Sequence, residues 1–208
     1  WYGEYIFRVI DHLCKGGPSY TYRVEFVPVT PSLGLSIPLV ARYSQDRQVM
    51  SVPRGNRFAT LISARRANFG GDLVFSAEGL PAGVNLAADS MPSNMSVAPL
   101  VFEAAADATV GGTLSDLIAR HADPNQKIEG HFDSNVELVY GFPNNTTYYT
   151  THIDRLAVAV TEEAPYKINL IEPKVPLVQN GSMQLKVVAE RKEGFAEPIH
   201  LYMPFLPP

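Results

Sequence analysis

Short runs in which apolar and polar residues alternate occupy most of the chain, and such runs are typical of strands with one buried face. In the run 20–27 the even-numbered residues are aromatic or aliphatic, whereas Thr21, Arg23 and Glu25 are polar. The run 5–10 precedes it, and the turn-forming sequence Gly-Gly-Pro lies between the two. The pattern predicts a β-hairpin over the first thirty residues.

Further strands are predicted throughout the middle of the chain, at 57–64, 72–77, 97–104, 112–119, 128–132, 136–140 and 155–160. Seven short strands separated by turns predict an antiparallel β-sandwich. The run 110–121 also has leucines and an isoleucine at helical spacing, so a helix is an alternative there. Two glycines and a threonine at its start favour the strand.

The large apolar residues on one face of these strands are expected to form the core: Leu61, Leu73, Phe75, Leu100, Phe102, Leu156, Val158 and Val160. In 156–160 alanines occupy the opposite face, which predicts close packing beneath another layer. Three prolines within 28–40 indicate either an extended linker or an edge strand, and a module boundary is predicted near Thr30.

An internal repeat is predicted because the chain aligns to itself without gaps at an offset of 126 residues. Segment 55–82 matches 181–208 with five identities in 28 positions. The identical pairs are Gly55/Gly181, Arg65/Arg191, Phe69/Phe195, Leu80/Leu206 and Pro81/Pro207. We interpret the chain as tandem modules: the C-terminal hairpin of a preceding module in 1–30, a complete sandwich in 31–164 and the N-terminal part of a following repeat in 165–208.

Two segments resemble known families. The sequence SAEGLPAGV at 76–84 resembles the strand end and turn of bacterial immunoglobulin-like modules in large secreted multidomain proteins. The Gly-Gly-Pro turn before YTYRV at 20–24 resembles the end of a pre-peptidase C-terminal-type domain. These resemblances imply immunoglobulin-like modules in tandem and an extracellular, periplasmic or cell-surface location. The first family carries no fixed catalytic residues, so none is transferred to this chain.

Composition limits the classes of partner. The net charge is −4, so there is no overall basic field to attract nucleic acid. No apolar stretch reaches the roughly 18 residues that a membrane-spanning helix requires, so no membrane insertion is expected. The single cysteine, Cys14, excludes an internal disulfide and is interpreted as a spare thiol rather than a nucleophile. No Gly-x-Ser-x-Gly elbow occurs, and no enzyme activity is predicted for this chain.

Three histidines are candidate metal ligands because each precedes an aspartate by two residues. The pairs are His121/Asp123, His131/Asp133 and His152/Asp154. On a strand such pairs share one face, and imidazole and carboxylate are common metal ligands. No metal motif of known spacing accompanies them, so we favour three unrelated solvent-facing pairs and predict no metal and no cofactor. A calcium ion between modules stays an open alternative.

Two groups are candidates for ligand binding or an interface. Arg65, Arg66 and Phe69 could bind an acidic glycan or a neighbouring module, although recurrence of similar residues at 191–195 favours a structural role at the module tip. Tyr148 and Tyr149 are expected on a loop, where they either stack on sugars or, as we favour, pack the end of the sandwich.

The predicted function is that of a non-catalytic spacer or interaction module in an exported bacterial multidomain protein. Its expected partners are neighbouring β-modules of the same protein, with a glycan or a cell-surface protein as further candidates. One alternative is a carbohydrate-binding module that uses Tyr148, Tyr149 or the loop near Phe142. Another is an accessory domain of a secreted protease or other hydrolase whose active site lies outside this chain.

Overall fold

The computed structural model describes residues 4–41, 44, 46–176, 178–201 and 203–205. Every regular element among them is a strand, so the predicted all-β fold class is confirmed. These residues contain no helix with the length and apolar character needed to cross a membrane. The chain divides into two units, Trp1–Thr30 and Pro31–Pro208, and each is described by itself.

The first unit has turns but no strand in its described residues, 4–30. The Tyr20 N–H donates to the Gly17 carbonyl at 3.0 Å, so a turn does form at the predicted place. The rings of Phe7 and Phe26 meet edge to face with centroids 6.1 Å apart, which brings the two arms together without a ladder. The predicted pair of hydrogen-bonded strands is therefore wrong. A two-stranded hairpin is marginally stable alone, and nearly all side chains of this unit are exposed.

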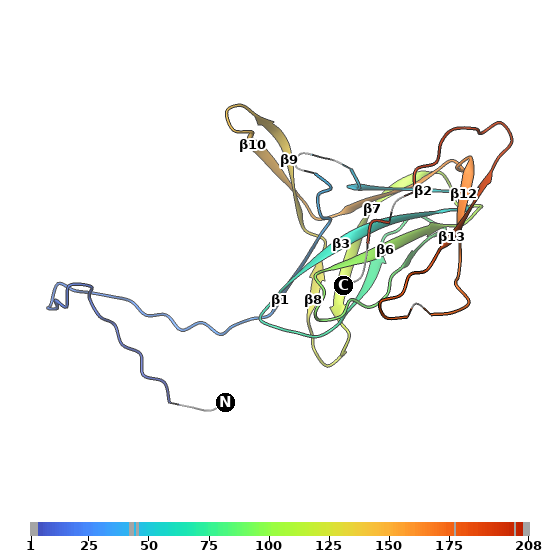
Figure 1. Cartoon of the computed structure of the whole chain (residues 1–208). Helices are drawn as coiled ribbons and strands as arrows, with labels where there is room; N and C mark the ends of the chain where they lie inside the picture. Colours follow the sequence, from blue (N-terminus) through green and yellow to red (C-terminus); the bar gives the residue numbers. More distant parts are fainter. Residues whose placement is uncertain (1–3, 42–43, 45, 177, 202, 206–208) are drawn as a thin grey trace. The chain divides into compact units, whose positions relative to one another are not determined.

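The first sheet of the second unit is antiparallel, in the order β1-β3-β6-β5 (Figure 1). Its strands are β1 (Ser32–Ser36), β3 (Arg57–Ala67), β6 (Val97–Ala104) and β5 (Val84–Ala87). Along β6 every second residue is buried, as expected of a strand with one face in the core. β1 forms the edge of this sheet, and the three prolines of segment 28–40 lie outside it, at positions 28, 31 and 38.

The second sheet has the order β2-β11-β7-β4, with β8 also paired to β7. Its strands are β2 (Val49–Pro53), β11 (Leu156–Thr161), β7 (Gly111–His121), β4 (Leu73–Glu78) and β8 (Glu129–His131). β2 runs parallel to β11, and the other pairs are antiparallel. The strand interpretation of 110–121 is confirmed because β7 is one continuous strand.

Between the two sheets lies one hydrophobic core, and most of the predicted core residues are in it. Those buried are Leu73, Leu100, Phe102, Leu156, Val158 and Val160. Phe75 is only partly buried against the core. Leu61 is also half-buried, whereas Ile62 is fully buried. Strand β3 has apolar residues on both faces, so the sequence pattern alone did not identify the inward one.

The two sheets meet along one edge, where β1 approaches β8. Leu35 of β1 forms a parallel bridge with Phe132, which follows β8 and is 1% exposed. The Asp133 N–H donates to the Leu35 carbonyl at 2.8 Å. We call this contact between β1 and the end of β8 the closure of the sandwich. It holds the chain in place immediately before β9 (Ser134–Gly141).

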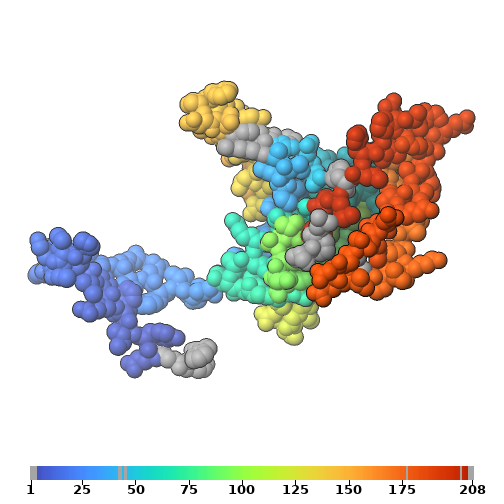
Figure 2. Space-filling view, in the orientation of Figure 1, coloured from blue at the N-terminus to red at the C-terminus, as the bar shows by residue number. Residues whose placement is uncertain are grey.

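Two separate two-stranded ribbons complete the second unit (Figure 1). β9 (Ser134–Gly141) pairs with β10 (Thr146–Ile153), and β12 (Tyr166–Ile171) pairs with β13 (Lys186–Arg191). The β9–β10 ribbon projects from the sandwich (Figures 1 and 2). The alternation pattern predicted β9 but missed β10 and β12.

The repeat has a limited structural counterpart. β13 aligns with β3, but it pairs only with β12, whereas β3 lies between β1 and β6. Residues 198–201, which align with the start of β4, form no strand. Leu206 and Pro207 lie outside the described residues. The two segments therefore share one strand, and their tandem repetition stays a prediction.

Candidate functional site

The β9–β10 ribbon is a hairpin whose pairing runs from Ser134↔Ile153 at its base to Gly141↔Thr146 at its tip. Thr, Val and Tyr residues, which favour strands, dominate β10 and much of β9. The tip turns through Asn144 and Asn145, whose φ angles are 61° and 49°. Asparagine tolerates this left-handed backbone better than most residues, so the local sequence specifies the turn.

Large apolar side chains are exposed along this ribbon. They are Leu138, Val139, Tyr140, Phe142, Tyr148 and Tyr149, with exposed fractions between 47% and 88%. Tyr148 and Tyr149 lie on strand β10, so the prediction of a loop is wrong. They are 60% and 58% exposed, so the favoured prediction that they pack the end of the sandwich is also wrong. The strand-forming sequence around them continues the ribbon, and among the described residues no other strand pairs with it.

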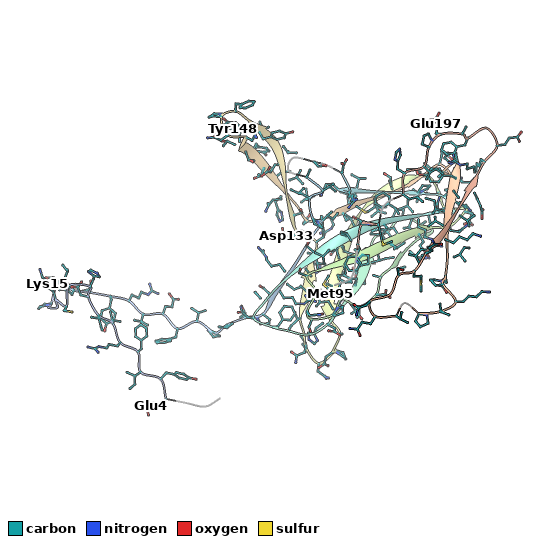
Figure 3. The ribbon with its side chains drawn as sticks, in the orientation of Figure 1. Glu4, Lys15, Met95, Asp133, Tyr148 and Glu197 are labelled. Carbon is teal, nitrogen blue, oxygen red and sulfur yellow. The ribbon has the colours of Figure 1, made fainter. Side chains whose placement is uncertain are left out.

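A double irregularity in the register sets the positions of the two tyrosines. Tyr149 pairs with Val139, whereas the next residue, Thr150, pairs with Glu137, so each strand has a bulge there. The Tyr148 hydroxyl donates to the Phe142 carbonyl at 2.8 Å, which ties Tyr148 to the ribbon tip (Figure 3).

A small hollow, which we call the basal hollow, lies at the foot of the same ribbon. Its volume is about 130 Å³, and its lining includes Leu39, Gln48, Asn135, Val136, Glu137 and Thr150. The amide nitrogen of Gln48 is buried and has no hydrogen-bond partner. The sequence alone does not indicate this hollow, because its residues come from segments far apart in the chain and carry no motif.

The predicted His-x-Asp pairs do not form as side-chain pairs. His131 contacts Asp116 and Glu129, and His152 instead contacts Asp133, at 2.6 Å. The Nδ1 atom of His121 accepts a hydrogen bond from the backbone N–H of Asp123 at 3.0 Å, and not from its side chain. Among the residues that the structure describes, no three metal-ligating side chains are placed to hold one ion.

His131 lies between two carboxylates on the outer face of the second sheet. Its Nδ1 is 2.9 Å from Asp116 Oδ2, and its Nε2 is 3.0 Å from Glu129 Oε1. Only the imidazolium form can donate from both ring nitrogens. The hydrogen bond to Asp116 is the main cause that raises the pKa of His131 above 6.5. Glu129 also binds Arg120, whose guanidinium donates to Ser76.

We expect this cluster to make stability depend on pH. Because the folded-state pKa of His131 is raised, its contribution is complete below the unfolded value near 6.5 and is lost as pH rises through the folded pKa. The contribution should stay below about 1 kcal/mol because His131 is half-exposed. Urea unfolding at a series of pH values should show that His131→Gln removes this loss, while His200→Gln retains it. An unchanged pH profile in His131→Gln would contradict the assignment.

Arg65, Arg66 and Phe69 line one open hollow beside the loop 93–96. The guanidinium of Arg66 already has a partner there, because it donates to the Met95 carbonyl at 2.5 Å. It also donates to the carbonyls of residues 91 and 92 at 3.4 and 3.3 Å. Burial lowers the pKa of Arg66, although Asp72 opposes this effect. Arg66 therefore braces a loop, while Arg65 is exposed.

Replacement of Arg66 by methionine should lower the free energy of unfolding by about 1–2 kcal/mol, since it removes charge-assisted hydrogen bonds to the loop carbonyls. Arg65→Met is the matched control on the next residue, and it should change stability by less than about 0.5 kcal/mol. Thermal unfolding followed by circular dichroism measures both. Equal losses in the two variants would show that the loop does not depend on Arg66.

The aligned residues in the second ribbon make different contacts. The Arg191 guanidinium lies 5.4 Å from the centroid of the Phe195 ring and donates to the Glu197 carbonyl at 2.6 Å. Lys192 pairs with Glu163 at 2.6 Å, and its hydrogen bond lowers the pKa of that carboxyl group. In both segments the basic side chains brace nearby loops, but through unrelated partners.

Comparisons with known proteins give no family for this chain. No protein-family model matches the sequence. A search of curated proteins gives no significant match.

Proposed function

We propose that this chain is a non-catalytic interaction module of an exported bacterial multidomain protein. The sandwich acts as a spacer, and the β9–β10 ribbon is its binding element. The observation that carries this proposal is the set of exposed apolar side chains on a ribbon with which no other strand of the described residues pairs. Contiguous exposed apolar surface in a folded domain usually marks an interaction site.

The proposal extends to the setting of the module. The resemblance of segment 76–84 to bacterial immunoglobulin-like modules supports a tandem array of such modules outside the cytoplasm, in the extracellular space, the periplasm or on the cell surface. Neighbouring β-modules of the same protein are the proposed structural partners. An accessory role beside a secreted protease or other hydrolase fits the same proposal, with the catalytic residues elsewhere in that protein.

The proposal is tested with the purified chain of 208 residues. We expect no turnover of casein, p-nitrophenyl esters or soluble polysaccharides. We expect binding to immobilised glycans or cell-surface proteins that is lost when Phe142, Tyr148 and Tyr149 are all replaced by serine. Robust hydrolysis by the isolated chain, or binding that survives the triple replacement, contradicts it.

A second candidate function is carbohydrate binding, and the position of Tyr149 specifically favours it. Its ring is 58% exposed on β10, where the hydrogen-bonding side chains of Thr150 and Thr151 follow it directly. An aromatic ring beside such groups suits a sugar, which has an apolar face and a polar edge.

Tyr149→Ala should weaken binding on a glycan array at least about tenfold, because aromatic anchors dominate small binding sites. The circular dichroism spectrum should be unchanged, since the side chain is exposed. A silent array for the wild-type chain would remove the carbohydrate candidate and leave a protein partner.

A further inference from the structure

We infer that the basal hollow is a subsite for one neutral pyranose ring, hydrogen-bonded by Gln48 and Glu137. This inference rests on the carbohydrate-binding candidate described above. It adds a site that the exposed tyrosines alone do not define.

The dimensions of the hollow suit a single sugar ring. At about 130 Å³ it has room for on the order of ten water-sized groups, similar to the number of non-hydrogen atoms in one hexose. Leu39 and Val136 contribute apolar surface, and Gln48, Asn135 and Thr150 contribute polar groups. A mainly apolar lining with a few convergent polar groups is the usual composition of a small-molecule site.

The hydrogen-bonding groups of the hollow are complementary to hydroxyl groups. The Gln48 amide nitrogen is buried without a partner, and an unpaired buried donor destabilises the fold unless another group accepts its hydrogen bond. The Glu137 carboxylate accepts hydrogen bonds but does not donate when ionised. A ligand that both donates and accepts satisfies both groups, and the hydroxyls of a sugar do so.

The charge of the ribbon favours a neutral ligand. Residues 134–153 contain one carboxylate, Glu137, and neither lysine nor arginine. An anionic sugar in the hollow would meet this carboxylate with no cation in the ribbon to compensate it. The nearest ribbon histidine, His152, is already paired with Asp133.

The hollow and the exposed aromatic residues belong to the same ribbon. Thr150 lines the hollow, and the residue before it on β10, Tyr149, is 58% exposed.

The experiment is an NMR titration of the ¹⁵N-labelled chain with the methyl glycosides of glucose, galactose, mannose and N-acetylglucosamine, with glucuronic acid as the anionic comparison. We expect at least one neutral glycoside to shift the side-chain amide signals of Gln48. Gln48→Met, which keeps the length of the side chain and removes the amide, should weaken that binding about tenfold. The variant should remain folded, because it replaces an unpaired buried amide with an apolar group.

Gln126→Met is the matched control, since it makes the same change at an exposed residue outside the hollow, and it should bind the glycoside as the wild type does. If the glycan array is positive but Gln48→Met binds with unchanged affinity, the basal hollow is wrong and the carbohydrate function survives. Preferential binding of glucuronic acid overturns the neutral assignment. If neither the array nor the titration shows binding, the inference and the carbohydrate function fail together.

Discussion

Replacement of Phe102 by alanine is expected to lower the free energy of unfolding of the sandwich by about 3–5 kcal/mol. Phe102 is 0% exposed on β6, where its neighbours in register are Phe58 of β3 and Leu86 of β5. Removal of the ring leaves a cavity that a close-packed core fills only in part. Urea unfolding followed by far-ultraviolet circular dichroism measures the change.

Phe142→Ala is the matched control for this prediction, because it makes the same chemical change on the exposed ribbon. Phe142 is 88% exposed, so its replacement should change stability by less than about 0.5 kcal/mol. A similar loss in both variants would mean that the ribbon tip is packed against other parts of the protein. That result would also remove the exposed patch on which the proposed function rests.

Where alternation was regular, the sequence was sufficient to predict strands and their buried faces. β6 and β11 have every second residue buried, and the predicted ranges 97–104 and 155–160 agree with them closely. Leu61 shows why the buried face was harder to predict in β3. Leu61 and Ile62 are both suitable core residues, and pairing with neighbouring strands decides which of them faces inward.

Partner choice between distant residues was not predictable from local spacing. His131 and Asp133 are two residues apart, yet His131 pairs with Asp116 of β7 and Asp133 pairs with His152 of β10. Strand register brings these groups together, and register is a property of the whole sheet. The same reason explains why Gln48 was missed as a neighbour of the ribbon.

The candidate site was predictable by residue type but not by position. Tyr148 and Tyr149 were identified as possible contacts, whereas their exposure on a projecting strand was not expected. No residue pattern in the sequence indicates that β9 and β10 project from the sandwich together. That arrangement depends on the closure between β1 and β8, which fixes the chain immediately before β9 begins.

Gly130 in β8 is a sensitive point of this closure, and Gly130→Ala should lower the free energy of unfolding by about 3 kcal/mol, at the upper end of the usual cost of overpacking. A Cβ atom there would lie 2.4 Å from the Leu33 carbonyl oxygen and 2.8 Å from the Leu33 carbonyl carbon. Both are backbone atoms of β1, so no side-chain rotation relieves the clash, and β1 and β8 must separate.

The matched control is Gly34→Ala on β1, because a Cβ atom at Gly34 would meet no other atom within 4 Å. This variant should stay within about 1 kcal/mol of the wild type. Thermal unfolding gives the stability of both variants, and amide hydrogen exchange should show faster exchange at the Asp133 N–H in Gly130→Ala alone, because that group donates to β1. Wild-type stability and exchange in Gly130→Ala would show that β1 and β8 do not close the sandwich, and the ribbon would then lose the anchor that holds its base beside the basal hollow.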